Sequence, residues 1–172
     1  EKIKDLSLVA TPPYDVISDQ EQEEYYSRHP NNVIRLDKAR TTPEDTPDNN
    51  PYTRAAEDFK KWLKEGVLIR DETQGFYLTT VTFPIEGKSV TRWGLIGAVR
   101  LEPFESGVIL PHEETFSKVK SERLELMKNC HANFSHIFSI YSDKNNILQK
   151  LKQHVDGRKP ESEFTDDSGH FH

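Results

Sequence analysis

The residues best suited to chemistry are concentrated between Leu110 and Tyr141, where acidic, basic and imidazole side chains follow one another closely. His112 and Glu113 come directly after Pro111. An imidazole titrates near neutral pH and a neighbouring carboxylate can pair with it, so this dipeptide is suited to a general base or a metal ligand. A surface turn that merely carries a histidine explains it equally well, and a metal site would need further ligands that the spacing does not supply.

The segment that follows is expected to form an amphipathic helix over residues 119–129. On a helical wheel, Arg123 falls inside the apolar arc and Lys120 lies on its flank. An isolated buried charge is costly, so an inward-facing arginine must pair with an acid or line a cleft that holds an anion. One interpretation is a structural ion pair to a carboxylate such as Asp15 or Glu113. The other is a phosphate or carboxylate ligand held by the planar donor fork of Arg123, with Lys120 beside it.

Further candidates lie on other elements. Two consecutive prolines stiffen the loop that presents Tyr14 and Asp15. Asp15 either acts in the site or caps a turn while Tyr14 packs against the core. Arg35 is expected on a short strand over residues 32–36, and Asn133 comes just after the helix. The candidate catalytic residues are therefore His112, Glu113 and Asp15, and the candidate ligand-binding residues are Arg123, Lys120, Asn133, Tyr14 and Arg35; no metal site is assigned.

Three more helices must position these residues. They are expected over residues 19–30, 51–66 and 145–155. The second is the most clearly marked, because an Asn-Pro pair precedes it, apolar residues recur every three or four positions, and Gly66 stands where a C-terminal cap belongs. Its aromatic stripe is typical of a core face. Residues 37–50 are rich in Pro, Thr and Asp and are expected to form a flexible loop.

The strands are expected to be mainly antiparallel. Residues 76–85 and 89–101 flank a Glu-Gly-Lys turn and predict a long hairpin. Gly94 and Gly97 interrupt its second strand, which indicates a bulge or a close approach of another group, the bulge being the preferred interpretation. A buried strand is expected over residues 137–141. This mixed order of elements favours a single α+β domain over residues 1–172, with packed helices and a mainly antiparallel sheet.

Composition limits the classes of partner. The chain has 172 residues and a formal net charge of -6, so it has no overall positive field to attract nucleic acid or an anionic membrane. No apolar run is long enough to span a bilayer. Cys130 is the only cysteine, which rules out a disulfide within the chain and favours a reducing cytoplasm; Cys130 itself is expected to be a small core residue. No glycine-rich phosphate loop occurs.

The two ends of the sequence lead to a further prediction. The sequence does not begin with Met, and its last eleven residues predict a strand, a turn over Asp166–Gly169 and the start of a returning strand. We therefore expect the natural protein to extend beyond both ends of these 172 residues.

The segments TPPYDVIS, NNVIRL, PYTRAAEDFKKWLKEGVLIRD and LPHEETFSKVKSERLELMKNCHANFSHIFSIY, followed by an acidic hairpin, resemble the bacterial and archaeal family called domain of unknown function 1015. The resemblance covers nearly the whole chain in order. It implies a protein about twice this length, whose other half carries a phosphate-binding motif similar to that of the ParB and sulfiredoxin superfamily, which includes nucleotide-dependent kinases for small molecules. The family-like positions present here are Pro13, Tyr14, Asp15, Asn32, Arg35, Pro111, His112, Glu113, Lys120, Arg123 and Asn133.

The expected function is binding of a phosphorylated small molecule or a nucleotide, with phosphoryl transfer by the intact protein as a further expectation. Arg123 and Lys120 would hold the anion, and His112 would move a proton. Asp15 or Glu113 would hold a metal or a substrate hydroxyl. The rival interpretation is a non-catalytic regulatory or protein-interaction domain, and a homodimer formed through an exposed sheet edge is a further expectation. The sequence names no cofactor.

Overall fold

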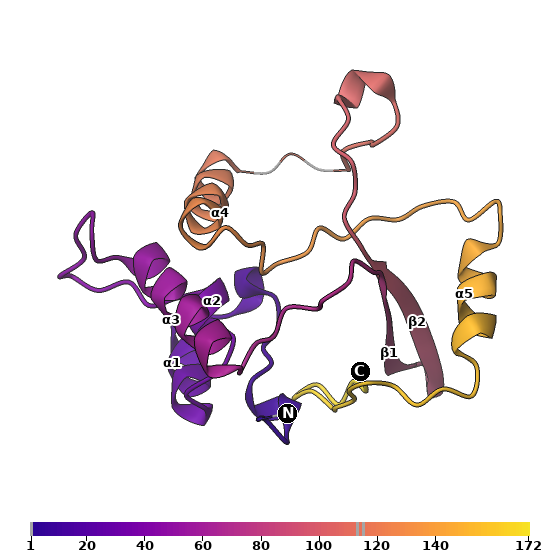
Figure 1. The fold of residues 1–172 in the computed structure, drawn as a ribbon, viewed down its shortest axis with the longest axis horizontal. Coiled ribbons are helices and arrows are strands. Elements are labelled where there is room, and N and C mark those ends of the chain that lie inside the picture. The colour runs from indigo at the N-terminus through magenta and orange to yellow at the C-terminus, as the bar shows by residue number, and fades with distance from the viewer. Residues whose placement is uncertain (1, 113, 115) are drawn as a thin grey trace.

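The computed structural model describes residues 2–112, 114 and 116–172. Its first half is helical: two 3₁₀ turns, Leu6–Leu8 and Tyr14–Val16, precede helices α1 (Asp19–Arg28), α2 (Ile34–Asp37) and α3 (Pro51–Glu65). Later in the chain, helix α4 (Ser117–Cys130) packs against α3. Figure 1 shows these four helices on one side of the molecule and a hairpin with the last helix on the other side, joined by extended chain.

The expected helices form because their ends are capped. In α1, Ser18 and Glu21 make a reciprocal capping box, which satisfies backbone N–H groups that the first turn leaves unpaired. In α3, the Asn50 side chain accepts hydrogen bonds from the first turn, and Gly66 ends the helix with a positive φ of 66°. The predictions for residues 19–30, 51–66 and 119–129 are confirmed, with shifts of a few residues at the ends.

The buried apolar core belongs to the helical side. Ala55 and Ala56 of α3 pack against Leu126 and Cys130 of α4. Among the described residues, the buried apolar side chains are Ile17, Tyr25, Ile34, Leu36, Ala55, Ala56, Trp62, Leu126 and Cys130. Cys130 is a core residue, as expected, and burial raises the pKa of its thiol.

Strands β1 (Tyr77–Ile85) and β2 (Lys88–Ile96) form the predicted antiparallel hairpin, although β2 ends five residues earlier than the predicted strand over residues 89–101. Glu86 and Gly87 make its two-residue turn with φ values of 48° and 76°, the conformation that matches the right-handed twist of the strands. The preferred bulge is absent at Gly94, which pairs with Thr79 in an unbroken register. A Cβ at Gly94 would lie 2.8 Å from Thr79 Oγ1, so this glycine makes room for a cross-strand neighbour.

The C-terminal turn connects the hairpin to the helices. Phe164 and His172 exchange backbone hydrogen bonds across the turn over Asp166–Gly169, as expected, and Phe171 exchanges two with Thr82 of β1. The Asp167 carboxylate accepts a hydrogen bond of 2.7 Å from Arg28 of α1. Burial raises the pKa of Asp166, but hydrogen bonds from His172, His170 and Ser168 outweigh this effect and leave the pKa below its ordinary value.

The strand predicted over residues 32–36 is wrong, because residues 34–37 form the short helix α2. The Asn32 side chain accepts a hydrogen bond of 3.0 Å from the Ile34 N–H and donates one of 2.9 Å to the Leu8 carbonyl. These two bonds turn the chain at Asn32, and the burial of Ile34 and Leu36 completes the helix.

The buried strand predicted over residues 137–141 is also wrong. These residues form neither a helix nor a strand, and Ile137 and Ile140 are 86% and 90% exposed. In the described part of the chain no strand lies alongside to pair with them. The apolar side chains on both faces of this segment predicted a buried strand. A segment is buried only where a neighbouring element packs against it.

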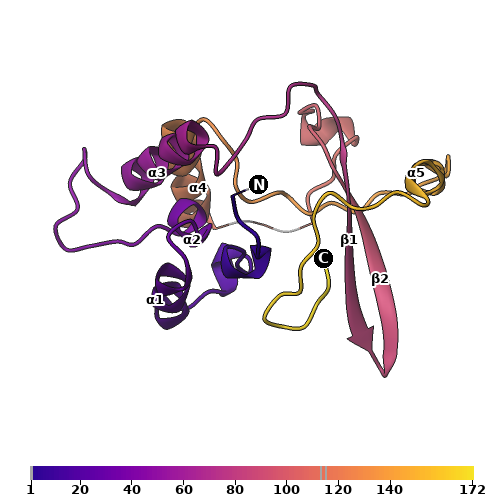
Figure 2. The same cartoon turned by 60° about the horizontal axis from the view of Figure 1, so that its bottom comes forward.

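Helix α5 (Ile147–Val155) confirms the last predicted helix. The Asp143 carboxylate caps its start by accepting from the Ile147 and Leu148 N–H groups. No residue of α5 is buried, and it stands beside the hairpin in both views (Figures 1 and 2). Helices combined with an antiparallel two-stranded sheet make this an α+β fold, as predicted. In the described residues, no helix is both long and apolar enough to cross a membrane.

Candidate functional site

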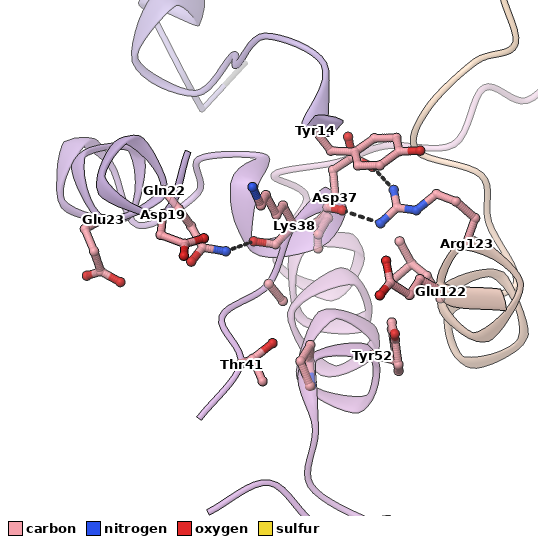
Figure 3. Close-up of a pocket in the computed structure, with 14 residues that line it drawn as sticks. Tyr14, Asp19, Gln22, Glu23, Asp37, Lys38, Thr41, Tyr52, Glu122 and Arg123 are labelled. Atoms are coloured by element: carbon pink, nitrogen blue, oxygen red, sulfur yellow. Dashed lines mark hydrogen bonds and ion pairs between the residues drawn. The ribbon is translucent and has the colours of Figure 1, made fainter. Parts of the chain in front are cut away.

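A pocket of about 550 Å³ opens where α1, α2, the start of α3 and α4 meet. Figure 3 shows Arg123 reaching into it from α4, beneath the ring of Tyr14 and opposite Asp37. The described lining residues are Tyr14, Asp19, Gln22, Glu23, Leu36, Asp37, Lys38, Ala39, Thr41, Pro51, Tyr52, Glu122, Arg123 and Leu126. The size is that of a small-molecule site.

The guanidinium of Arg123 is oriented by two hydrogen bonds to Asp37. Nη1 donates to the Asp37 carboxylate and Nη2 donates to the Asp37 carbonyl, each over 2.7 Å. The hydroxyl of Ser135 donates to the same carboxylate oxygen over 2.6 Å. The side chains of Arg123 and Asp37 are 25% and 12% exposed, so the pair is largely removed from water. The inward orientation predicted for Arg123 is confirmed, and its acidic partner is Asp37, which the sequence analysis did not name.

Tyr14 covers the guanidinium. The Arg123 Cζ lies 4.0 Å from the centroid of the Tyr14 ring, within the range of a cation–π contact. Tyr14 begins a 3₁₀ turn directly after Pro13, whose φ of -55° and ψ of 141° direct the chain toward α4. Tyr14 is half-buried, with one face of its ring against this charged group. The stiff proline loop positions this aromatic face.

The guanidinium is not fully satisfied by the described protein atoms. An arginine side chain carries five N–H donors, and Asp37 accepts two of them. The Arg123 Nε is buried and has no acceptor among the described residues. A buried donor without a partner costs about 1–3 kcal/mol. Because this Nε is not exposed, a ligand would have to use the N–H donors of Nη1 and Nη2 that Asp37 leaves free.

The charged side chains around the pocket are of both signs. Its described lining carries two cationic side chains, Lys38 and Arg123, and four carboxylates, on Asp19, Glu23, Asp37 and Glu122. Three of these acids have cationic partners: Arg123 pairs with Asp37, Arg40 pairs with Glu23, and Lys118 lies 3.8 Å from Glu122. Arg40 and Lys118 are not among the described lining residues, so the lining itself carries more negative than positive side chains.

Two helix N-termini border the pocket and add positive potential. Asp19 is the first residue of α1 and Pro51 is the first residue of α3, and both line the pocket. The unpaired N–H groups of a helix start carry a partial positive charge of about half a unit. At α3, the Asn50 side chain already accepts from the Tyr52 and Thr53 N–H groups, so this end contributes potential and not free donors.

Two further lining residues have defined roles. Lys38 donates to the Ile17 carbonyl, and its own carbonyl accepts a hydrogen bond of 2.7 Å from Gln22. Burial raises the pKa of the Tyr52 hydroxyl, and the Glu122 carboxylate raises it further. A tyrosine hydroxyl is protonated at neutral pH even without this shift, so Tyr52 can donate to a ligand.

The remaining predicted site residues lie elsewhere. Asp15, Lys120 and Asn133 are exposed, and none of them is among the described lining residues. Arg35 stacks on Tyr26, with its Cζ 4.3 Å from the ring centroid, and donates to the Tyr26 carbonyl over 2.8 Å. The pocket therefore brings together Tyr14 and Arg123 from the predicted set.

The predicted His112–Glu113 pair is described only in part. Glu113 lies outside the described residues, so its role stays a prediction. His112 is exposed and is not among the described lining residues of the pocket. In the part of the chain that the structure describes, no group of three or more His, Cys, Asp or Glu side chains is arranged to hold a metal ion.

Sequence reasoning missed Asp37, Ser135 and Tyr52. Asp37 was assigned to the start of a flexible loop and Tyr52 to a core stripe. Only a weak signal existed for Asp37: it stands three residues after Ile34, a helical spacing, but the i, i+2 spacing of Ile34 and Leu36 is that of a strand. No local pattern indicates that an acid 86 positions before Arg123 is its partner.

Comparison with known proteins gives one family. The family model described as "Protein of unknown function (DUF1015)" matches residues 1–172. No curated protein and no solved structure matches the chain. The comparison therefore assigns no activity to the fold or to the pocket.

Proposed function

The chain belongs to the DUF1015 family, and from the residues around Arg123 we propose that it binds a phosphorylated small molecule or a nucleotide in the Tyr14–Arg123 pocket. The expected ligand group is a phosphate, because an arginine fork matches the geometry of two adjacent anionic oxygens. Phosphoryl transfer is proposed only for the longer protein that the family resemblance implies. The other half of that protein would carry a phosphate-binding motif similar to that of the ParB and sulfiredoxin superfamily.

The observation that carries the proposal is the oriented guanidinium of Arg123 on the wall of the pocket. The Tyr14 ring and the Asp37 bonds fix its plane, and Asp37 accepts only two of its five N–H donors. A cation that is held rigidly loses little side-chain entropy when an anion binds. The arrangement is therefore better suited to binding an anion than a mobile surface arginine would be.

The surroundings of Arg123 support the same proposal. The helix starts at Asp19 and Pro51 add positive potential, and Lys38 supplies a second cation. Leu36, Pro51 and Leu126 give the pocket an apolar wall, which a bare phosphate ion would not need. This wall would contact the remainder of a phosphorylated small molecule or the base of a nucleotide.

Isothermal titration calorimetry tests the proposal. The 172-residue chain would be titrated with inorganic phosphate, a sugar phosphate, and nucleoside mono- and triphosphates, each with and without Mg²⁺. We expect Arg123→Lys to weaken binding of the best ligand about tenfold or more, because lysine keeps a charge for Asp37 but loses the planar fork.

The matched control is Lys128→Ala on the same helix, an exposed lysine that pairs with Glu125 outside the pocket. It should leave the affinity unchanged. The proposal fails if the unmodified chain binds no member of the panel, or if both variants weaken binding equally.

A second candidate function is that of a non-catalytic interaction domain. It is favoured by one observation, the large number of exposed apolar side chains between Val99 and Tyr141. Apolar patches larger than a few hundred Å² usually mark sites where another molecule binds. The two functions use different surfaces and are compatible in one protein.

A further inference from the structure

A phosphate alone does not account for the acidic side chains that line the Tyr14–Arg123 pocket. The described lining carries four carboxylates and two cationic side chains, and one of these cations, Lys38, already donates to the Ile17 carbonyl. A ligand with only negative charge would be repelled by every carboxylate that lacks a close cationic partner. The excess of acids therefore indicates that the ligand also carries a positive group.

Two of the four carboxylates are already used within the protein. The Asp37 carboxylate accepts hydrogen bonds from Arg123 and Ser135. The Glu23 carboxylate pairs with Arg40. A ligand would have to break these contacts to use either group, so the other two carboxylates are the ones available to it.

These two carboxylates belong to Asp19 and Glu122. Among the described residues, no hydrogen bond or ion pair holds the Asp19 carboxylate. Glu122 has one cation within range, Lys118, but the two groups are 3.8 Å apart and the Lys118 side chain is 87% exposed. An exposed pair at this distance contributes little. Both carboxylates can therefore accept N–H bonds from a ligand.

Glu122 is the available carboxylate that lies beside the anion-binding group. It directly precedes Arg123 on α4, and Figure 3 shows its carboxylate between Arg123 and Tyr52. Burial raises the pKa of the Tyr52 hydroxyl, Glu122 raises it further and Arg123 lowers it, so both charges lie near this one hydroxyl. Asp19 lies across the pocket on α1 (Figure 3). A ligand only a few bonds long can therefore reach Arg123 and Glu122 together.

The arrangement around Glu122 fits an ammonium group better than a metal ion. In the part of the chain that the structure describes, no three His, Cys, Asp or Glu side chains are arranged to hold a metal. A primary alkylammonium is charged at neutral pH and presents three N–H donors in a compact group. One carboxylate with a neighbouring hydroxyl oxygen, here that of Tyr52, is sufficient to accept from it.

We propose that the ligand of this pocket is a phosphorylated primary amine, whose phosphate binds Arg123 and whose ammonium binds the Glu122 carboxylate. The inference rests on the proposed phosphate-binding function and adds the second charge that the ligand carries. Glu122 is then a specificity-determining residue, because it attracts the amine and repels ligands that carry phosphate alone.

Isothermal titration calorimetry with a matched pair of probes tests the inference. Phosphoethanolamine and ethyl phosphate share the phosphate and the two-carbon chain, and only the first carries an ammonium. The titrations contain EDTA, so that no metal ion bridges the phosphate to a carboxylate. We expect phosphoethanolamine to bind the 172-residue chain about tenfold or more tightly, because hydrogen bonds between charged groups are among the stronger polar contacts.

Glu122→Gln should change the two affinities in opposite directions. Phosphoethanolamine should bind about tenfold more weakly, because its ammonium loses the carboxylate. Ethyl phosphate should bind somewhat more tightly, because a repelling charge is removed. A variant that merely deformed the pocket would weaken both. The Glu122 side chain is 43% exposed, so this change should leave the fold intact.

The matched control is Glu57→Gln on α3. Glu57 is exposed and is not among the described lining residues of the pocket, so both affinities should stay unchanged. Retention of the preference for the amine in Glu122→Gln, or its equal loss in Glu57→Gln, would overturn the assignment of the ammonium to Glu122.

The probes separate this inference from the function on which it rests. Equal binding of phosphoethanolamine and ethyl phosphate would overturn the inference and leave the phosphate site standing. Binding of inorganic phosphate or a nucleotide without binding of phosphoethanolamine would do the same. If no phosphate compound binds, the proposed function fails and the inference fails with it.

Discussion

At the scale of single residues, the pair of Arg123 and Asp37 does two things at once. It joins α4 to α2, and it fixes the guanidinium plane on the wall of the pocket. A structural ion pair and a ligand-binding arginine were alternative interpretations of the sequence. The geometry is compatible with both, because Asp37 uses two of the five N–H donors of Arg123.

Replacing Asp37 with asparagine should destabilise the fold. The change keeps the size of the side chain but leaves Arg123 as a largely buried charge without an acid, and it weakens the bond from Ser135. We expect the free energy of unfolding to fall by about 2–3 kcal/mol, somewhat less than the roughly 3–5 kcal/mol for breaking a fully buried pair, because the side chains keep some exposure. Urea denaturation at neutral pH would measure it.

The control for that prediction is Glu125→Gln, the same chemical change in an exposed pair. Glu125 and Lys128 are about half exposed and lie 2.8 Å apart. Exposed pairs of this kind contribute about 0–1 kcal/mol. Similar losses in both variants would mean that Asp37 is held no more tightly than a surface acid.

The residue scale also marks the limit of sequence-based prediction. The helical wheel placed Arg123 correctly, because its apolar neighbours recur with the helical period. It could not supply Asp37, since partners distant in sequence are chosen by tertiary packing. Only a structure brings Tyr14, Asp37 and Ser135 together around one guanidinium.

At the scale of elements, the caps decide where helices begin and end. Gly66 adopts a left-handed φ of 66° at the end of α3, where a side chain costs about 1–2 kcal/mol. Gly66→Ala should therefore lower the free energy of unfolding by about 1 kcal/mol. Gly75→Ala is the matched control, because φ there is ordinary and no atom lies within 4 Å of an added Cβ. Equal stability of the two variants in urea would contradict the assigned cap.

Elements with strong local signals were predictable, and elements that depend on a partner were not. Helices α1 and α3 and the hairpin have caps, periodicity and a suitable turn within their own sequence. Residues 32–36 have a β-branched composition, but the buried Asn32 side chain turns the chain into α2. Residues 137–141 have strand composition and lack a neighbour among the described elements.

At the scale of the whole molecule, stability should be uneven. The buried apolar side chains of the described residues lie on α1, α2, α3 and α4, and at Ile17 just before α1. Helix α5 contributes none. Opening α5 therefore exposes little new apolar surface, and an isolated nine-residue helix is marginal in water. Hydrogen-exchange mass spectrometry should show amides of α5 exchanging much faster than those of α3.

The internal reference for that measurement is α4, whose Leu126 and Cys130 are buried and which should exchange as slowly as α3. Protection of α5 equal to that of α3 and α4 would show that the hairpin and α5 unfold together with the helical core.

The separation of Asp37 and Arg123 along the chain also has a consequence for biosynthesis. The two residues are 86 positions apart, and Ser135 comes later still. At ordinary translation rates the ribosome needs roughly 5–15 seconds to add that many residues. Throughout this interval Asp37 of the nascent chain lacks its partner Arg123, and the pocket beside it lacks the wall that α4 provides. A chain that ended before α4 would lack Arg123 and the α4 wall, and so could not form the pocket.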